Sequence, residues 1–362
     1  MTSSRTRWIG LVFISLAVSL IIVDSTIVNV AIPSIIDDLG LTSTQVQWVQ
    51  ESYTLVFAAL LLVFGTLADK FGRRRMMVIG MALFGVSSIA AALVTTPDLL
   101  IGARVIQGLG GAMVLPTTLS LVNATFRGKE RGIAFAIWGS TIGGMVAVGP
   151  LLGGWLTTDF SWRWAFGINI PLSIIIIVGA LISVQESKEP TARRIDWVGA
   201  VLSVIALTAL VFGLIEGRTY GWWLVNKPFV VGDITWGSGI SIIPVCFAIF
   251  VIATVAFIVH GMSRQKRGKS TLIAFNLFTI SSFTNGNIAA MIISMGEFGI
   301  ILSLPLWLQF VVGYDALQTG FVILALAIGA FVASGLAGGL SGRVEPVRMV
   351  QLGILLEIIG VA

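Results

Sequence analysis

Charged residues are scarce in this chain of 362 residues: Lys, Arg, Asp and Glu make up only 11% of it, whereas hydrophobic residues make up 56%. Soluble globular domains carry about 25% charged residues, because their surfaces face water. The single cysteine, Cys246, excludes a disulfide framework within the chain. Histidine occurs once and no Cys, His, Asp or Glu residues have the spacing of a metal site, so we expect no metal. The composition indicates a protein embedded in a lipid bilayer.

Motifs that carry enzymatic chemistry are also missing from the sequence. The run "GLGG" at Gly108–Gly111 lacks the Lys-Ser/Thr pair that a phosphate-binding loop requires. No nucleophile has a recognisable general base beside it. We therefore expect that the protein is not an enzyme and uses no cofactor.

Long apolar runs recur along the whole chain. The first extends to Pro33, which is too long for the core of a signal peptide, so we expect it to be retained as a membrane helix. Hydropathy predicts ten complete spans and the start of an eleventh. The predicted spans are 8–33, 45–68, 76–95, 99–123, 131–157, 165–184, 196–216, 239–261, 281–311, 317–340 and 348 onward. The predicted fold class is therefore all-α, as a polytopic membrane protein.

Basic residues alternate between the loops. All but four of the 22 Lys and Arg lie in the N-terminal segment or in every second loop. Basic loops mark the cytoplasmic side of a membrane protein. We therefore expect a multi-pass protein of the inner (plasma) membrane with a cytoplasmic N-terminus. The same alternation accounts for the net charge of +5 without a nucleic-acid partner.

Two short patterns recur about 270 residues apart. The segments Gly65–Arg73 ("GTLADKFGR") and Gly335–Arg343 ("GLAGGLSGR") share two glycines and an arginine at identical spacing, and Pro33 aligns with Pro305 at nearly the same offset. This predicts two parallel six-helix halves with two extra helices between them. The predicted domains are an N-terminal half at 1–187, a two-helix linker at 188–270 and an incomplete C-terminal half at 271–362. We therefore expect that the chain is a C-terminally truncated fragment.

The stretch "GTLADKFGRRR" (Gly65–Arg75) forms a turn between two predicted spans on the expected cytoplasmic side. Gly65 and Gly72 permit close backbone approach and a sharp turn. Asp69 lies at the C-terminal end of its helix, where the helix dipole disfavours a carboxylate, so it needs partners among the cations that follow. Anchoring by basic residues alone leaves Asp69 and the glycines unexplained.

Asp24, Arg104 and Glu297 are charged residues inside predicted spans. Charges at such depth are expensive and are usually functional. Asp24 and Arg104 lie at comparable depth and could pair or share a water network. Both a structural ion pair and a coupling pair that is alternately protonated and charged fit this placement. Glu297 is predicted to bind either a proton or a cationic substrate, with a structural acid as the alternative.

Several stretches resemble one transporter family. The turn matches the loop signature of the major facilitator superfamily, G-x-L-A-D-[KR]-x-G-[RK]-[RK]. "LIGARVIQGLGGA" (Leu100–Ala112) is similar to its fourth-helix motif, and "GPLLGG" (Gly149–Gly154) resembles the fifth-helix motif of its proton antiporters. "VDSTIVNVAIP" (Val23–Pro33) and "WRWAFGINIP" (Trp162–Pro171) resemble its 14-helix drug:proton antiporter branch.

The resemblance implies the major facilitator fold and, together with the charges inside the spans, gives a set of functional residues. Proton coupling and substrate binding are assigned to Asp24, Arg104 and Glu297, with Asn29, Pro33, Gln107 and Gly108 in support. A gating turn that latches the two halves is assigned to Gly65, Asp69, Gly72 and Arg73, and an antiporter helix to Gly149, Pro150, Gly153 and Gly154. Met145 departs from the pattern, because antiporters usually have a glycine there.

The expected function is proton-coupled export of amphipathic, cationic drugs or antibiotics by alternating access. The expected partners are a small-molecule substrate, protons and the lipid bilayer, with the proton gradient as the energy source and a monomeric state. Three alternatives remain open: an exporter of one metabolite or antibiotic, an uptake symporter and a truncated membrane protein without transport activity. The motif "GPLLGG" counts against the symporter.

Overall fold

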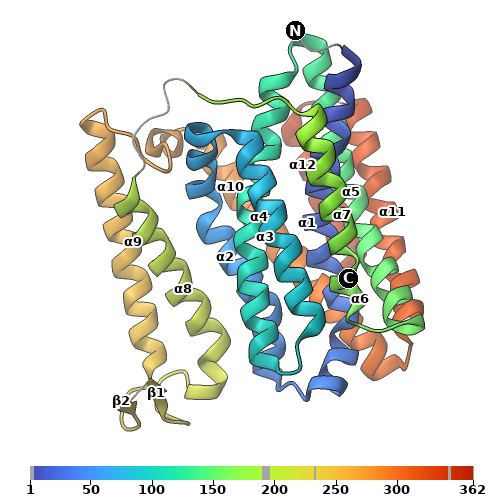
Figure 1. Cartoon of the computed structure of the whole chain (residues 1–362). Coiled ribbons are helices and arrows are strands. Elements are labelled where there is room, and N and C mark those ends of the chain that lie inside the picture. The colour runs from blue at the N-terminus through green and yellow to red at the C-terminus, as the bar shows by residue number, and fades with distance from the viewer. Residues whose placement is uncertain (1–3, 190–195, 232–233, 341–343, 362) are drawn as a thin grey trace.

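The structure, a computed structural model, describes residues 4–189, 196–231, 234–340 and 344–361, and nearly all of it is helical (Figure 1). The first five helices are α1 (Ser4–Leu39), α2 (Ser43–Phe71), α3 (Arg73–Leu93), α4 (Pro97–Thr125) and α5 (Gly128–Asp159). Four more follow: α6 (Trp164–Gly167), α7 (Asn169–Ser183), α8 (Trp197–Tyr220) and α9 (Ile242–Lys266). The chain continues with the 3₁₀ turn η1 (Phe275–Thr279), α10 (Ser281–Trp307), the π-helical turn η2 (Leu308–Val312), α11 (Ala316–Leu340) and α12 (Pro346–Val361).

Every predicted membrane span coincides with a helix. Among the described residues, nine helices are long and apolar enough to cross a membrane, with α6 and α7 counted as one and α10 extended by η2. A further apolar helical stretch lies at Ala316–Leu326 of α11. The prediction of an all-α, multi-pass membrane protein is confirmed, whereas the division into domains at 187 and 270 stays a prediction.

The sixth predicted span is interrupted near its start. α6 ends at Gly167 and α7 begins at Asn169. Pro171 has no N–H, so the carbonyl of Gly167 cannot receive the usual helical hydrogen bond from it. The interruption places Asn169 at the first turn of α7, where its side chain is fully buried.

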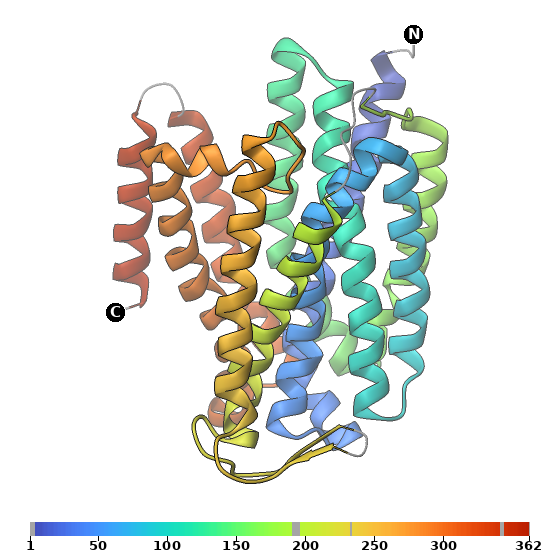
Figure 2. The same cartoon turned by 90° about the vertical axis from the view of Figure 1, so that its left-hand side faces the viewer.

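α8 and α9 form an antiparallel pair beside α2 at one edge of the bundle (Figures 1 and 2). The connection between them contains β1 (Phe229–Val231) and β2 (Ile234–Trp236), which pair antiparallel. These two short strands are a small departure from the all-helical expectation. Phe229 packs edge-on against Tyr220, so the hairpin is held to the end of α8.

The α8–α9 pair is attached to α2 by two polar contacts. Trp48 Nε1 donates a hydrogen bond of 2.7 Å to Glu216 Oε1. One turn away, the hydroxyl oxygens of Thr44 and Thr219 are 3.1 Å apart. Both contacts lie toward the end of the bundle that carries the β hairpin.

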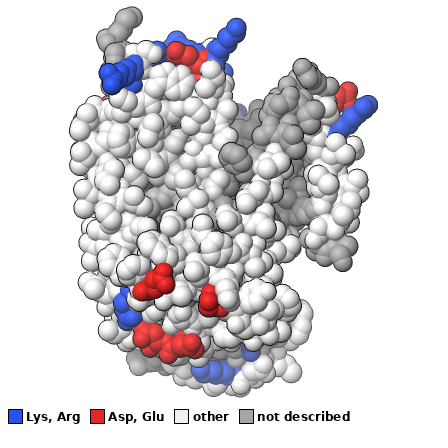
Figure 3. Space-filling view, turned by 90° about the vertical axis from the view of Figure 1, so that its right-hand side faces the viewer, with Lys and Arg blue, Asp and Glu red and all other residues white. Residues whose placement is uncertain are grey.

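Charged side chains gather at the two ends of the bundle. We call the end with the N-terminus, the α2–α3 turn and the α4–α5 turn the basic end, because Arg7, Arg73, Arg74 and Arg131 lie there. The opposite end, with the β hairpin, is called the far end. On the face drawn in Figure 3, a broad band in which the described side chains include no Lys, Arg, Asp or Glu separates the charges of the two ends. Such a band fits a hydrocarbon layer.

Two apolar clusters form the core of the first seven helices. The basic-end core includes Ile14, Met77, Met81, Phe84 and Ile176, each at most 1% exposed. The far-end core includes Ile27, Val28, Val49, Leu100 and Phe166, likewise at most 1% exposed. The candidate site lies where the two clusters meet.

Candidate functional site

An ion pair between α1 and α4 forms the centre of the candidate site. Arg104 Nη1 lies 2.5 Å from Asp24 Oδ2. Asp24 is 0% exposed and Arg104 is 1% exposed. The predicted proximity of these residues is confirmed. Because both charges are withdrawn from water, loss of either partner leaves the other charge buried and uncompensated.

Arg104 is held by three further contacts. Its Nε donates to the backbone carbonyl of Val49 at 3.1 Å, and its Nη1 also donates to Gln107 Oε1 at 3.0 Å. The guanidinium carbon lies 4.2 Å from the centroid of the Tyr53 ring, within the range of a cation–π contact. α2 and α4 therefore fix the orientation of the guanidinium relative to Asp24.

Two side-chain amides donate to the carboxylate of Asp24. Asn169 Nδ2 reaches Asp24 Oδ1 at 2.6 Å, and Gln107 Nε2 reaches the same oxygen at 3.3 Å. Both amides also donate to Ser88 Oγ, at 3.3 Å and 2.8 Å respectively. Hydrogen bonds to an ionised group are among the stronger ones in proteins. The network therefore joins α1, α3, α4 and α7 into one polar centre.

The polar centre is enclosed between the two apolar cores. On α1, Ile21 belongs to the basic-end core and Ile27 to the far-end core, with Asp24 between them. Along α6 and α7, Phe166 belongs to the far-end core and Ile176 to the basic-end core, with Asn169 between them. The carboxylate is thus separated from both ends of the bundle by packed apolar side chains.

The chemistry available at this centre is proton exchange. It contains one carboxylate, one guanidinium and two amides, and a carboxylate can bind and release a proton. Within the described ranges, no group of three or more His, Cys, Asp and Glu residues is placed to hold a metal ion. Protonation of Asp24 changes the net charge of the pair by one.

Other predicted site residues lie outside this centre. Asn29 accepts a hydrogen bond from Gln50 of α2, and Pro33 lies within α1. A Cβ on Gly108 would lie 2.5 Å from the carbonyl oxygen of Tyr53, so this glycine lets α2 and α4 approach closely. Glu297 lies in α10, and its side chain is outside the described part of the chain.

Sequence reasoning missed three members of the network: Ser88, Asn169 and Tyr53. Asn169 carried a signal, because it is a polar residue in the proline-interrupted segment "WRWAFGINIP". Ser88 carried none, since serines in membrane helices commonly bond their own backbone, as Ser88 does to Phe84 at 2.7 Å.

The predicted gating turn joins the end of α2 to the start of α3. Arg73 Nη2 lies 2.8 Å from Asp69 Oδ1, which confirms that this carboxylate has a partner among the following cations. Arg73 Nη1 also donates to Ser187 Oγ at 3.2 Å. These contacts tie the turn to the segment that follows α7, and the latch between the two halves stays a prediction.

The Glu186 side chain caps the N-terminal end of α3. Its carboxylate accepts the backbone N–H groups of Arg74 and Arg75 at 3.1 and 3.2 Å. Exposed N–H groups and the helix dipole make the start of a helix favourable for a carboxylate. Gly72 adopts a φ of 121°, and a Cβ there would lie 2.7 Å from the Glu186 carboxylate.

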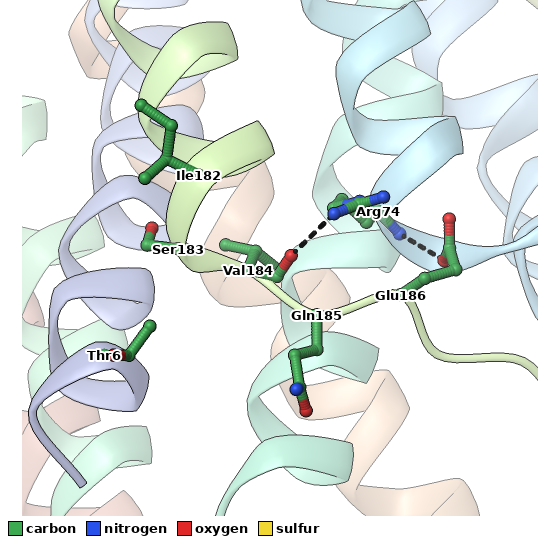
Figure 4. A pocket seen from close by; sticks show the side chains of 7 residues that line it. All are labelled: Thr6, Arg74, Ile182, Ser183, Val184, Gln185 and Glu186. Carbon is green, nitrogen blue, oxygen red and sulfur yellow. Dashed lines mark hydrogen bonds between the residues drawn. The ribbon is translucent and has the colours of Figure 1, made fainter. Parts of the chain in front are cut away.

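A surface hollow of about 480 Å³ opens beside this turn (Figure 4). In its lining, Arg74 Nη1 donates a hydrogen bond of 3.1 Å to the backbone carbonyl of Val184. The hollow is lined by Thr6, Arg74, Ile182, Ser183, Val184, Gln185 and Glu186. These residues lie at the basic end, on α1, α3, the end of α7 and the segment that follows it, and none of them belongs to the polar centre.

The predicted antiporter helix packs against α1 through glycines. A Cβ on Gly153 would lie 2.8 Å from the carbonyl oxygen of Ile27, and one on Gly149 would overlap the hydroxyl of Thr26. Small residues at such positions let membrane helices approach closely. This side of α5 therefore contacts the helix that carries Asp24.

The same helix packs against α11 on its other side. A Cβ on Gly154 would overlap the carbonyl of Ala316 and lie 2.9 Å from the Cα of Leu317. In return, a Cβ on Gly320 would lie 2.7 Å from the carbonyl oxygen of Pro150. α5 thus connects α1 to the second half of the chain.

Comparison with known proteins agrees with this arrangement. The family model of the Major Facilitator Superfamily matches residues 14–362. Among solved structures, a peptide transporter in complex with sulfate has a TM-score of 0.59 at 15% identity, over 93% of this chain and 70% of that one. At this identity the similarity shows the fold alone.

Curated relatives are about one-third identical. The "Probable actinorhodin transporter" of Streptomyces coelicolor is 32% identical over 349 residues, which cover 93% of this chain and 57% of that protein. The "Multidrug resistance protein Stp" of Mycobacterium tuberculosis is 32% identical over 358 residues, which cover 99% of this chain and 63% of that protein. The chain thus spans 57% and 63% of the length of these relatives. With the family match over nearly its whole length, the chain belongs to the major facilitator superfamily.

Proposed function

We propose that this protein is a proton-coupled exporter of amphipathic, cationic drugs or antibiotics that works by alternating access. The basic end faces the cytoplasm in this proposal, as the distribution of Lys and Arg predicts. The substrate binds near the membrane midplane between the two halves. The proton gradient supplies the energy.

The observation that carries the proposal is the burial of Asp24 with Arg104 inside the membrane-spanning bundle. Asp24 is 0% exposed and its nearest cationic atom is 2.5 Å away. A protein gains little stability from such a pair compared with well-packed apolar side chains, because desolvation offsets the attraction. Ionisable residues inside the membrane are therefore typical of proton and substrate pathways.

Proton binding at Asp24 changes the net charge of the buried pair by one. Once Asp24 is neutral, Arg104 keeps a buried positive charge without a counter-ion. A conformation that lets water or another anion reach Arg104 is then favoured over the closed one. A proton is coupled to a conformational change when its binding alters the relative stability of two conformations.

α5 provides the mechanical connection. Its glycines contact α1 beside Asp24 through Thr26 and Ile27, and contact α11 through Ala316. A shift of α1 after protonation is therefore transmitted to the second half through α5. Glu297 of α10 remains the candidate acid for binding the cationic substrate.

The names of the relatives support two substrate ranges. The relative named for multidrug resistance supports broad export, whereas the one named for actinorhodin supports export of a single natural product. The narrow exporter is therefore the second candidate function. A substrate panel separates the two.

The test is proton-driven movement of a fluorescent lipophilic cation into inverted membrane vesicles, with the full-length protein and its Asp24→Asn variant. We expect uptake that collapses with a protonophore and is lost in Asp24→Asn. Uptake that persists in the variant contradicts the coupling role of Asp24 and leaves Glu297 as the leading acid. Absence of uptake by the unmodified protein contradicts broad export and favours the narrow exporter.

A further inference from the structure

Asp24 is surrounded by hydrogen-bond donors. Its Oδ2 accepts from Arg104 at 2.5 Å, and its Oδ1 accepts from Asn169 at 2.6 Å and from Gln107 at 3.3 Å. This arrangement suits a carboxylate, which only accepts hydrogen bonds. A protonated carboxyl group must donate one, and buried donors are nearly always paired. The neutral form of Asp24 therefore needs an acceptor that the present arrangement does not offer.

Two of the three neighbouring acceptors are already engaged. Gln107 Oε1 accepts from Arg104 at 3.0 Å. Ser88 Oγ accepts from both amides and donates to the carbonyl of Phe84 at 2.7 Å. Asn169 Oδ1 differs from them, because it is buried and has no hydrogen-bond partner within the described chain. Asn169 thus holds the spare acceptor of the network.

The geometry of an amide makes that acceptor available to Asp24. The oxygen and nitrogen of a carboxamide are similar in size, and a half-turn about the last side-chain bond exchanges them. After such a turn, Oδ1 of Asn169 takes the place of Nδ2, which now lies 2.6 Å from Asp24 Oδ1. The side chain is 0% exposed and needs no additional space for this exchange.

We propose that Asn169 is a positioning residue that serves Asp24 in both protonation states, as a donor to the carboxylate and, after its carboxamide turns over, as an acceptor from the carboxyl group. The inference rests on the proposed coupling role of Asp24. When a proton from water binds Asp24 Oδ1, the new O–H donates to Asn169 Oδ1. When the proton leaves, the amide returns and Nδ2 donates again.

The charged neighbours of Asp24 are the same in both states. α4 contributes Arg104, and α2 contributes the Tyr53 ring that lies against the guanidinium. α3 and α7 contribute the uncharged Ser88 and Asn169, and α5 faces α1 here through Gly149. Amide substitutions therefore change hydrogen bonds to Asp24 while its described charged surroundings stay constant.

The test compares two near-isosteric amide removals, Asn169→Leu and Gln107→Met, by the pH dependence of vesicle uptake. Asn169→Leu removes the spare acceptor for protonated Asp24 and also the 2.6 Å donor to the carboxylate, which keeps Arg104 and Gln107. Because each protonation state loses one hydrogen bond, the two effects on the pH midpoint oppose each other, and we expect a shift of less than about half a unit. Gln107→Met removes a donor to the carboxylate and leaves Asn169 in place. We expect its midpoint to rise by about half a unit to one unit, because only the carboxylate loses a hydrogen bond.

A measurement without transport keeps the test decisive if either variant transports poorly. Infrared difference spectra on acidification report the carboxyl C=O band of protonated Asp24, identified by its loss in Asp24→Asn. In Asn169→Leu this band is expected to move to the frequency of a carboxyl group without a hydrogen-bond acceptor, whereas Gln107→Met leaves it in place. Size-exclusion profiles check that the variants fold.

The outcomes separate the inference from the proposed function. A midpoint shift that is smaller in Asn169→Leu than in Gln107→Met, together with the band shift, supports Asn169 as the acceptor. A larger rise in Asn169→Leu than in Gln107→Met, or a carboxyl band that stays in place in Asn169→Leu, overturns it and leaves Asn169 a donor to the carboxylate alone. If the band behaves as expected but Asp24→Asn still takes up drug, the coupling role of Asp24 fails while the hydrogen-bond assignment of Asn169 holds.

Discussion

Gly154 of α5 lies directly against the carbonyl group of Ala316 in α11, with no space for a side chain between the two helices. Gly320 of α11 approaches the carbonyl of Pro150 in the same way. The contact is therefore reciprocal, with one glycine on each helix. It joins the first half of the chain to the second at the helix whose sequence resembles the antiporter motif.

Adding one methyl group at this contact tests its importance. We expect Gly154→Ala and Gly320→Ala to lower transport at least tenfold, because each Cβ meets backbone atoms that cannot rotate away. Gly139→Ala is the control in α5, since nothing lies within 4 Å of a Cβ there. The control should transport normally, because alanine favours a helix over glycine. Vesicle uptake per folded protein is the measurement, and normal uptake by both contact variants would show that the junction tolerates separation.

Removal of Arg104 tests the energetic role of the buried pair. We expect Arg104→Leu to lose about 3–5 kcal/mol of stability, because it leaves the Asp24 carboxylate buried without a cation. The double variant Asp24→Asn/Arg104→Leu should recover most of that loss, since neither charge remains. Thermal unfolding in detergent measures both proteins. Equal unfolding temperatures for the single and double variants would mean that Asp24 is already compensated by its amide donors.

The α2–α3 turn can be tested at Gly72. Gly72→Ala should be destabilised by its left-handed φ and by contact with the Glu186 carboxylate, 2.7 Å from the new Cβ. Gly128→Ala has a positive φ of 55° in the ordinary left-handed region and nothing within 4 Å, so it reports the smaller cost of a left-handed alanine without a steric contact. We expect Gly72→Ala to unfold at the lower temperature, and Glu186→Ala to restore part of the difference. If Glu186→Ala does not raise the unfolding temperature of Gly72→Ala, the strain lies in the backbone alone.

The attachment of the α8–α9 pair to α2 can be tested by cross-linking. The hydroxyl oxygens of Thr44 and Thr219 are 3.1 Å apart, so cysteines at both positions should form a disulfide on mild oxidation. Cys246→Ser supplies the background without other thiols. Loss of maleimide labelling after oxidation is the measurement, and Thr44→Cys with Arg218→Cys is the control pair. Equal cross-linking of both pairs would contradict a fixed contact.

The sequence predicted the spans and the proximity of Asp24 and Arg104 because both follow from single-helix properties. Apolar length marks a span, and a charge inside a span has a depth that can be counted from its end. Asn169 and Ser88 could not be assigned in this way, since their role depends on which helices are neighbours. The same limit applies to Glu186, which caps a helix whose first residues are more than 110 positions away. The β hairpin escaped prediction because each strand has only three residues.

The two apolar cores on either side of Asp24 also determine where an electrical potential falls. A transmembrane voltage drops mainly across dry, low-dielectric layers, and each unit charge that crosses 100 mV is worth about 2.3 kcal/mol. With both layers closed, a proton at Asp24 has crossed only part of the field. Opening the far-end core to water would bring the full drop onto the basic-end core, so that proton release at the basic end would carry nearly the whole electrical term. The packing of Ile14, Met81 and Phe84 against one another would then determine how much of the voltage the carrier can use.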